Sequence, residues 1–520
     1  MHYRRIGLIA ASLALAVTSF ANYAPNIEQI SKNNLRADLE FIASDLLLGR
    51  DTPSQGLDLA AAYIISQLKI NGVMPGGENG SYLQPISLER ALLSTEGTLF
   101  QIDGKDIELG AGYMPTGLEP ADVQGTTVFV KSGWTNLEKG IDPMKGMSLK
   151  GAIILTDGNL PEGVNARDAF RDPKWESPAV AAKRNGAVAV ITIAAGANPA
   201  LWKRQLDRMT AGSRYTQVDP KEQSSLPSIQ VSPEVGDTLK TMALNAARAE
   251  FSAPSPMVTL KLNVKKDMAV ANNVIGIVPG SDPVLKNEYV ALGAHYDHIG
   301  VGRPDATGDT INNGADDDGS GTVAMLEISR VIANNVHPKR STIFVWHCGE
   351  EKGLWGSRYF AANPTIDFKK LIIQVNMDMI AMAKKPGDTN PANADLTDSR
   401  SIYVIGPKLI SSDITKTLNA VNNATVKMNL LDTYDTTTDP NSYYTRSDHY
   451  SYIQKGVPAI FLFSGSHENY HRPSDEVKNI DFDKLTLTTK LLYGLAYEFA
   501  MQPEHPKVDG PLKSLFGGLQ

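Results

Sequence analysis

Residues 289–298 read Tyr-Val-Ala-Leu-Gly-Ala-His-Tyr-Asp-His, an apolar run that ends in a group of polar side chains. The apolar part, Tyr289–Gly293, has the near-continuous hydrophobic character of a strand that is covered on both faces. Similar runs recur along the chain after residue 267, and helix-like segments separate them. This alternation predicts an α/β fold in three layers, with a mixed, largely parallel sheet between two layers of helices.

Five further runs have the same apolar character and are predicted to be strands: Val274–Val278, Thr342–His347, Leu371–Asn376, Ser401–Ile405 and Ala459–Phe463. Apolar residues at helical spacing predict helices in four places: within 28–75, where Gly72 supplies a stop signal, around 324–332, over 413–422 and over 483–500. These elements are enough for one large domain.

The chain has 520 residues, more than a single hydrophobic core usually organises, so we expect two domains. Between 115 and 255 the pattern changes to short β-rich runs with a small helical run, Ala179–Asn185, and this region contains no histidine. We predict an inserted β-rich domain over 115–255 without chemistry of its own. The main domain then consists of 22–114 and 256–505, and 506–520 forms a C-terminal tail.

The N-terminus has the pattern of a secretory signal peptide. Arg4 and Arg5 precede the apolar run Ile6–Val17, and a small-x-small ending follows at 19–21. The run is too short for a membrane anchor, so we expect cleavage after residue 21 and a secreted or periplasmic protein with no membrane anchor in its mature form. Loss of both arginines changes the formal charge from -7 to -9, which disfavours binding to nucleic acid.

Ligands of open α/β sheets bind beyond the carboxyl ends of the strands, so the polar residues after each apolar run are the candidates for chemistry. His295 offers an imidazole, and Asp297 is placed to receive the second ring N–H of a metal-bound histidine. Asp316, Asp317 and Asp318 follow, between glycines and just before a helix. A bound cation would relieve their mutual repulsion, but an exposed acidic loop that caps a helix gives the same pattern.

Two later strands also end in acidic residues. Glu350 and Glu351 could divide metal binding and proton transfer between them, although adjacent surface glutamates are the more ordinary interpretation. Asp378 lies among apolar residues, where desolvation favours a paired or metal-bound carboxylate. Cys348, the only cysteine, is predicted to be a buried structural thiol.

The segment after Ala459–Phe463 contains His467-Glu468-Asn469-Tyr470-His471, which matches the pattern His-Glu-x-x-His. In zincins this motif lies on a helix, so that both histidines face one ion. Here a strand and Gly465 precede the motif and Pro473 follows it, which favours a loop. We therefore keep His471 alone as a candidate ligand.

Taken in order, the motifs are His-x-Asp, Gly-Ala-Asp-Asp-Asp-Gly-Ser-Gly, Gly-Glu-Glu-x-Gly-Leu-x-Gly-Ser, Asn-Met-Asp-Met and Tyr-His. In this order the sequence resembles the secreted bacterial two-zinc aminopeptidases, whose wider family includes glutamate carboxypeptidase, transferrin receptor and glutaminyl cyclase. The resemblance covers 28–90 and 267–500. The region 115–255 resembles, mainly by its position, the protease-associated domain often inserted in that family.

The resemblance implies metal ligands for two zinc ions: His295 and Asp378 for one, Glu351 and His471 for the other, and Asp317 as the bridge between them. It also implies that the two ions activate a water molecule that attacks the first peptide bond of a peptide substrate.

Further roles follow from the resemblance. Glu350 is expected to carry the proton, Tyr470 to stabilise the oxyanion, and Asp297 to orient His295. A cis peptide is expected between Asp317 and Asp318.

Three other functions stay open at this point. A glutaminyl cyclase would hold one zinc ion, and a carboxypeptidase specific for acidic C-terminal residues would need an arginine cluster in its pocket. Outside the enzymes, the chain could be a binding module built around the inserted domain. The presence of all five metal positions in order argues against a relative that has lost its metals.

Overall fold

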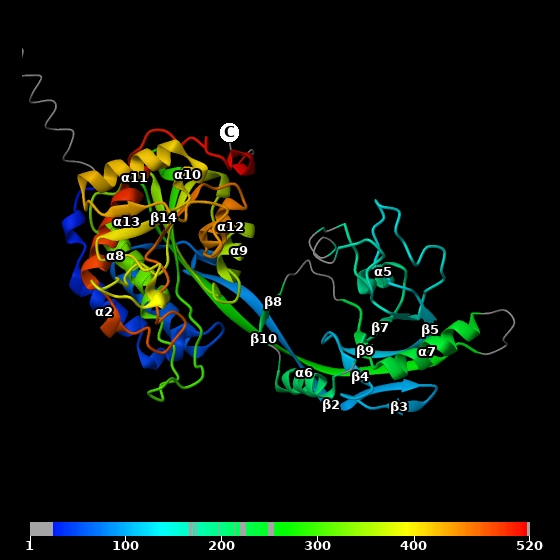
Figure 1. Ribbon diagram of the computed structural model, residues 1–520. Coiled ribbons are helices and arrows are strands. Elements are labelled where there is room, and N and C mark those ends of the chain that lie inside the picture. The colour runs from blue at the N-terminus through cyan, green and yellow to red at the C-terminus, as the bar shows by residue number, and fades with distance from the viewer. Residues whose placement is uncertain are drawn as a thin grey trace, which may run out of the picture. The chain divides into compact units, whose positions relative to one another are not determined.

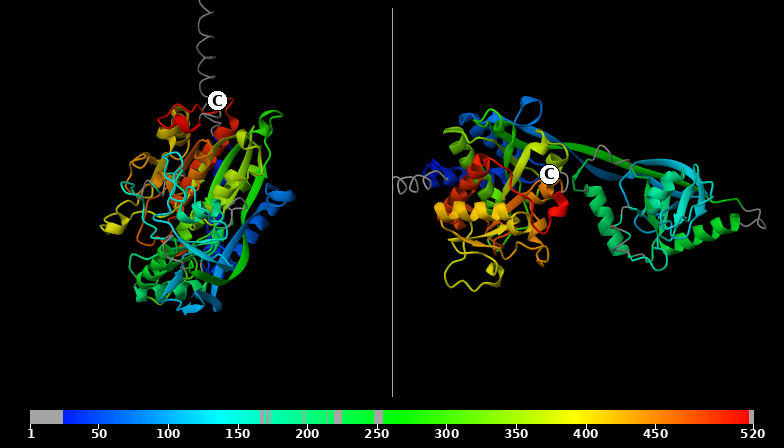
Figure 2. Two further views of the ribbon diagram at one scale, coloured as in Figure 1. Left: turned by 90° about the vertical axis from the view of Figure 1, so that its right-hand side faces the viewer. Right: turned by 90° about the horizontal axis from the view of Figure 1, so that it is seen from above.

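The computed structural model describes residues 24–165, 169, 172, 174–196, 198–212, 214–218, 225–247 and 254–516, so the expected signal peptide lies outside it. The chain divides into two compact units, one formed by the chain up to Ile86 and from Val270 onward, the other by Ser87–Ala269. The second unit is wider than the insertion expected at 115–255, because strands β2 (Leu83–Ile102) and β10 (Met257–Val278) contribute to it. Strand β10 is continuous in both views of Figure 2.

The first unit is built on a mixed sheet in the order β15-β14-β16-β13-β11-β12-β10-β1. Its strands are β15 (Asn429–Leu431), β14 (Ser401–Ile405), β16 (Ala459–Phe463), β13 (Leu371–Met377), β11 (Tyr289–His295), β12 (Ser341–His347), the last part of β10, and β1 (Met74–Pro75). The central strands β16, β13, β11 and β12 are parallel, whereas β14 and β10 are antiparallel to β16 and β12. The predicted α/β fold with a largely parallel sheet is confirmed.

Helices cover both faces of this sheet. One layer contains α2 (Lys32–Ile42), α3 (Gln55–Ile70), α8 (Gly321–Ala333), α11 (Ser412–Ala424) and α13 (Phe482–Met501). The other contains α9 (Trp355–Ala362) and α12 (His449–Ile453). Figure 1 shows α8 and α13 on one side of β14 and α9 and α12 on the other. Among the described residues, no helix combines the length and apolar character that crossing a bilayer requires.

Helix α3 illustrates how local sequence sets these elements. The hydroxyl of Ser54 accepts the N–H of Leu57 and so caps the first turn. The predicted apolar stripe is buried, with Ile64 and Leu68 fully inaccessible to solvent. After the helix, Gly72 adopts a positive φ of 71°, the backbone conformation that lets glycine end a helix.

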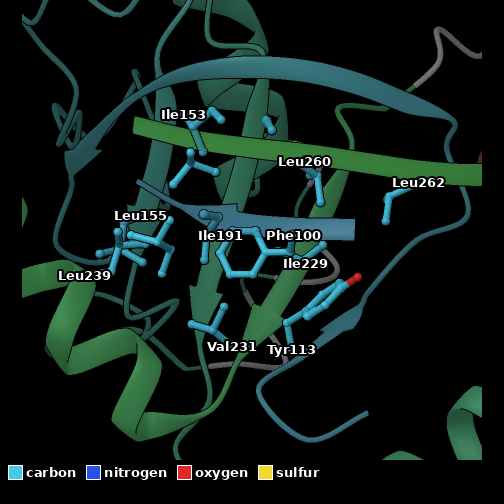
Figure 3. Packing of buried hydrophobic residues seen from close by; sticks show 13 residues of the cluster. Phe100, Tyr113, Ile153, Leu155, Ile191, Ile229, Val231, Leu239, Leu260 and Leu262 are labelled. Atoms are coloured by element: carbon cyan, nitrogen blue, oxygen red, sulfur yellow. The ribbon is translucent and has the colours of Figure 1, made fainter. Parts of the chain in front are cut away.

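The second unit has a sheet in which β5 (Ala121–Phe129), β6 (Ile153–Thr156), β7 (Ala189–Ile193) and β9 (Ser228–Val231) are parallel, and β4 (Tyr113–Pro115) is antiparallel to β9. Its core is a cluster of buried side chains from these strands and from β2, which includes Phe100, Tyr113, Ile153, Leu155, Ile191 and Ile229 (Figure 3). The described residues of this unit also include helices α5 (Pro178–Arg184), α6 (Pro199–Ala211) and α7 (Pro233–Ala246). Helix α5 lies where the sequence predicts a helical run, whereas α6 and α7 were not predicted.

Candidate metal centre

The candidate site residues come together at the carboxyl ends of the parallel strands. His295 is the last residue of β11, Glu351 follows β12 and Asp378 follows β13. His471 lies in the loop after β16, and Asp317 lies in the irregular turn Ala315–Ser320 that leads into α8. The sheet therefore gathers onto one edge five side chains that are widely separated in the sequence.

Asp317 lies between two groups of possible ligands. On one side, Nε2 of His295 is 3.2 Å from Oδ1 of Asp317 and 3.6 Å from Oδ1 of Asp378. On the other, Nε2 of His471 is 3.2 Å from Oδ2 of Asp317 and 3.1 Å from Oε2 of Glu351. Tetrahedral zinc with ligands at about 2 Å holds them roughly 3.3 Å from one another, so both groups have the spacing of atoms around a cation.

The charges at this edge suit a cation. Burial alone would lower the pKa of His295, but Asp378 and the adjacent Asp317 outweigh it and hold this pKa well above its usual value. In the same way Asp317 and Glu351 overcome the burial of His471 and raise its pKa to about 10. A site that stabilises two imidazolium charges in this way also stabilises metal ions in their place, since cation and proton compete for the same ring nitrogens.

Unpaired buried atoms support the same conclusion. Oδ2 of Asp317, Oε1 of Glu351 and Nδ1 of His298 are buried without a hydrogen-bond partner. Leaving such groups unpaired costs free energy, and a bound cation would satisfy all three at once. The residues present therefore fit a metal centre.

Of the three adjacent aspartates, only Asp317 faces both groups of ligands. Oδ1 of Asp318 accepts the N–H of Gly321 and Oδ2 accepts the N–H of His295, at 2.9 and 3.1 Å. Asp316 accepts the N–H of Ala381 at 2.7 Å. Although Asp318 lies within reach of a metal at His295 and Asp378, its oxygens are already occupied by backbone amides, so it holds the turn in place. The Asp317–Asp318 peptide is cis.

Two supporting residues were not found from the sequence. The Asp475 carboxylate accepts the backbone N–H groups of Asp316 and Asp317, at 3.0 and 3.1 Å. Arg50 is fully buried, and its guanidinium donates to the carbonyls of Tyr296 and Gly314, at 2.8 and 3.0 Å. Nothing in the spacing of the motifs points to either residue, because both act on backbone groups that only the fold brings near.

Asp297 contacts the centre differently from the expectation. The ring Nδ1 of His295 lies 3.1 Å from the backbone oxygen of Asp297 and 3.7 Å from its Oδ1. That Oδ1 atom instead accepts the N–H of Glu350, at 3.1 Å. The backbone carbonyl is thus the closer partner of the imidazole, and the carboxylate fixes the loop that carries Glu350 and Glu351.

A cavity of about 350 Å³ opens onto the ligands. Glu350, Asp378 and Tyr470 line it together with apolar side chains from Leu354, Met379, Phe461 and Phe463 and with two arginines, Arg358 and Arg446. Burial, reinforced by Asp378 and Glu351, raises the pKa of Glu350 well above its usual value. The hydroxyl of Tyr470 accepts a hydrogen bond from Nη2 of Arg446, at 3.3 Å.

The His-Glu-x-x-His segment is a loop with turns and not a helix, in agreement with the prediction. Only one of its histidines reaches the centre. Nε2 of His467 lies 3.3 Å from Oδ2 of Asp316, which is not one of the predicted ligands. Cys348 is buried and free, and burial raises the pKa of its thiol well above the usual range, as expected for a structural thiol.

The chain is similar to curated aminopeptidases over the segment that holds this centre. Leucine aminopeptidase 1 of Ajellomyces dermatitidis is 29% identical over 237 residues, which cover 44% of this chain and 56% of the relative. Leucine aminopeptidase 1 of Ajellomyces capsulatus is 30% identical over 237 residues, with the same coverage. The chain thus spans little more than half the length of these relatives.

Solved structures that resemble this chain include the aminopeptidase from Aneurinibacillus sp. strain AM-1, which is 20% identical with a TM-score of 0.48; the match covers 93% of this chain and 97% of that one. A zinc aminopeptidase from Bacillus subtilis is 18% identical with a TM-score of 0.46, over 90% of this chain and 95% of that one. The model of Peptidase family M28 matches residues 273–496, a segment that includes every candidate ligand of the metal centre.

Proposed function

We propose that the protein is a zinc-dependent aminopeptidase that removes residues from the amino end of peptides. The observation that carries this proposal is the position of Asp317, whose two oxygens lie 3.2 Å from His295 on one side and from His471 on the other. A single carboxylate placed in this way suits a pair of metal ions better than one ion. The similarity to leucine aminopeptidases supports the same reaction.

In this proposal His295 and Asp378 would hold one zinc ion, Glu351 and His471 would hold the other, and Asp317 would be shared by both. Zinc bound there would lower the pKa of a water molecule enough for it to attack a peptide carbonyl near neutral pH. The short distances within each group, 3.2 and 3.6 Å around His295 and 3.2 and 3.1 Å around His471, support ion binding with little rearrangement.

The remaining steps belong to side chains of the cavity. Glu350 takes the proton of the attacking water and passes it to the amine that leaves. Tyr470 donates its hydroxyl proton in a hydrogen bond to the oxyanion that forms on the carbonyl oxygen. The carboxylates of Glu350 and Asp378 attract the free α-ammonium of the substrate, which favours removal of the first residue over internal cleavage.

A carboxypeptidase for acidic residues is the second candidate, because the cavity contains two arginines. Arg446 contacts the hydroxyl of Tyr470 and lies over the ring of Tyr443, at 5.4 Å from its centroid. The guanidinium of Arg358 has no hydrogen-bond or ion-pair partner among the described residues. Only Arg358 is therefore free to bind a substrate carboxylate, whereas an acidic C-terminal residue would need a cluster of arginines. The aminopeptidase is the better assignment.

The export and domain assignments complete the proposal. The N-terminal sequence pattern supports secretion or delivery to the periplasm. The unit Ser87–Ala269 is proposed to be a protease-associated domain without a catalytic role, which agrees with its lack of histidine.

The test uses full-length protein loaded with zinc and assayed on aminoacyl p-nitroanilides, with and without chelator. We expect turnover that chelator abolishes and that Glu350→Gln lowers about 10²-fold or more while zinc content is unchanged. The matched control is Glu468→Gln, since Glu468 is exposed and hydrogen-bonds Asn390 and Asn393 outside the centre. Loss of turnover in the Glu468 variant alone would instead favour the zincin interpretation, and cleavage of N-blocked peptides only from the carboxyl end would favour the carboxypeptidase.

A further inference from the structure

We propose that His298 is a direct ligand of the zinc ion held by Glu351 and His471, in addition to the five ligands assigned above. The inference rests on the proposed two-zinc centre and gives one of its two sites a second imidazole. His298 lies in the same loop as His295, but the spacing of the motifs gave it no role.

His298 is buried beside two of the candidate ligands, Glu351 and Asp317. Its side chain is fully buried, and Nδ1 lies 2.9 Å from Oε1 of Glu351 and 3.7 Å from Oδ2 of Asp317. Its ring meets the ring of His471 edge-on, with centroids 5.6 Å apart and an interplanar angle of 70°. His298 and His471 therefore approach the same two carboxylates from different directions.

The contact between His298 and Glu351 is not a hydrogen bond. Nδ1 and Oε1 are close enough for one, yet both atoms are without a hydrogen-bond partner because the ring N–H direction misses the oxygen. Two buried ligand atoms that lie 2.9 Å apart without a hydrogen-bond partner can both be satisfied by one ion bound between them. A neutral imidazole and a carboxylate oxygen are both usual zinc ligands.

The surrounding backbone fixes the ring of His298. Its backbone N–H donates to the carbonyl of Arg50 at 3.2 Å, next to the bridge between His298 and Asp51. A β-carbon added at Gly314 would lie 2.6 Å from Cγ of His298, so the glycine is what leaves room for the ring. Burial of an imidazole in one fixed position, with both nitrogens unpaired, needs a ligand to compensate it.

The proposal makes the two metal sites unequal. The Glu351 site has two imidazoles, from His298 and His471, whereas the site of Asp378 has only that of His295. Because imidazole is a favourable zinc ligand and the Glu351 site has one more imidazole than the Asp378 site, we expect zinc to fill the Glu351 site first.

The experiment measures metal binding and not only activity. Apoprotein of the full chain is titrated with zinc against a competing chelator, and the zinc-loaded protein is studied by X-ray absorption to count imidazoles at the zinc–nitrogen distance of about 2.0–2.1 Å. We expect two zinc ions and three imidazoles for the natural protein. His298→Ala should retain two imidazoles and bind the tighter zinc more than 100-fold more weakly, beyond the 10–100-fold effect typical of a group that only supports a ligand.

His337→Ala is the matched control, because both ring nitrogens of His337 contact backbone oxygens, of Pro279 and Ala333, and none contacts the candidate ligands. A count of two imidazoles in the natural protein with two zinc ions bound overturns the inference and leaves the proposed function intact, whether or not His298→Ala folds. A change of tenfold or less in a folded His298→Ala variant overturns it as well. Failure of the natural protein to bind two zinc ions or to cleave any aminoacyl substrate would instead overturn the proposed function itself.

Discussion

The ring of Tyr470 stacks on the ring of His471, with centroids 3.9 Å apart and an interplanar angle of 26°. The turn that brings a candidate ligand to the centre therefore also sets the phenol beside it. Burial and the charges of Asp317 and Glu351 raise the pKa of Tyr470 above its usual value, so the phenol remains a hydrogen-bond donor through the neutral range.

Tyr470→Phe should lower kcat about 10²–10³-fold, as the loss of one oxyanion donor does, while zinc content stays the same. Steady-state kinetics on an aminoacyl p-nitroanilide, with metal analysis of the same sample, measures both quantities. Tyr450→Phe is the control, because Tyr450 lies near Tyr444 and does not line the cavity. An unchanged kcat in Tyr470→Phe would assign the ring to packing alone.

Substitution of Asp317 and substitution of Asp378 should lower the zinc content of the protein to different extents. Asp317→Ala removes a carboxylate that faces both groups of ligands, and we expect it to lose both zinc ions. Asp378→Ala removes a ligand of one group and should retain one zinc ion. Elemental analysis after dialysis measures the ratio of zinc to protein, with Asp207→Ala, a surface variant whose carboxylate pairs with Lys203, as the control. Equal losses in the two site variants would contradict the bridging role.

His449 should make the stability of the metal-free protein depend on pH. Its ring is buried with Nε2 3.0 Å from the carbonyl oxygen of Tyr444, and burial lowers its pKa to about 4. As the pH falls below the unfolded value of 6.5, the unfolded chain takes up a proton that the folded chain does not, so the folded state loses stability. The neutral variant His449→Gln lacks this effect, and the stability of the natural protein relative to it should fall by about 1.5 kcal/mol between pH 6.5 and 5.

Urea unfolding of both proteins in chelator at the two pH values measures this difference in the free energy of unfolding. Chelator is needed because zinc binding also weakens as the pH falls. If the natural protein and His449→Gln differed in free energy of unfolding by the same amount at both pH values, His449 would have the same pKa in the folded and unfolded chain.

Zinc itself should stabilise the first unit. Without metal, Asp317 and Glu351 each have a buried oxygen that lacks a hydrogen-bond partner. Zinc ions that bind only the folded state stabilise that state by mass action. A site whose free zinc is a hundred times its Kd contributes about 2.7 kcal/mol. Thermal melting over a series of free zinc concentrations should show a midpoint that rises with zinc, and a midpoint independent of zinc would be inconsistent with the centre.

Most of the main sheet could be predicted from the sequence because its strands are apolar on both faces. The predicted run Thr342–His347, for example, differs from β12 by a single residue. Helices α9 and α12 were missed because they are short, with eight and five residues. Helices α6 and α7 carried a signal that went unused, since each begins with an N-cap residue followed by proline, Asn198-Pro199 and Ser232-Pro233.

The candidate ligands could be predicted in order because each follows a strand of a parallel sheet, and the structure brings them together. What the sequence could not reveal is which polar groups pair after folding. Arg50 is a charged residue that would ordinarily be placed at the surface, and its burial depends on carbonyl groups of Ile42, Tyr296 and Asn313. His298 was passed over because a histidine in a loop has many possible partners, and only the fold excludes them.

The placement of His471 after the last strand of the sheet also has a consequence for the timing of activity. A chain that has emerged only as far as Asp378, just after β13, already holds His295, Asp317, Glu351 and Asp378, yet it lacks the imidazole of His471. The proposed centre would therefore be completed only once β16 and the loop after it have joined the sheet.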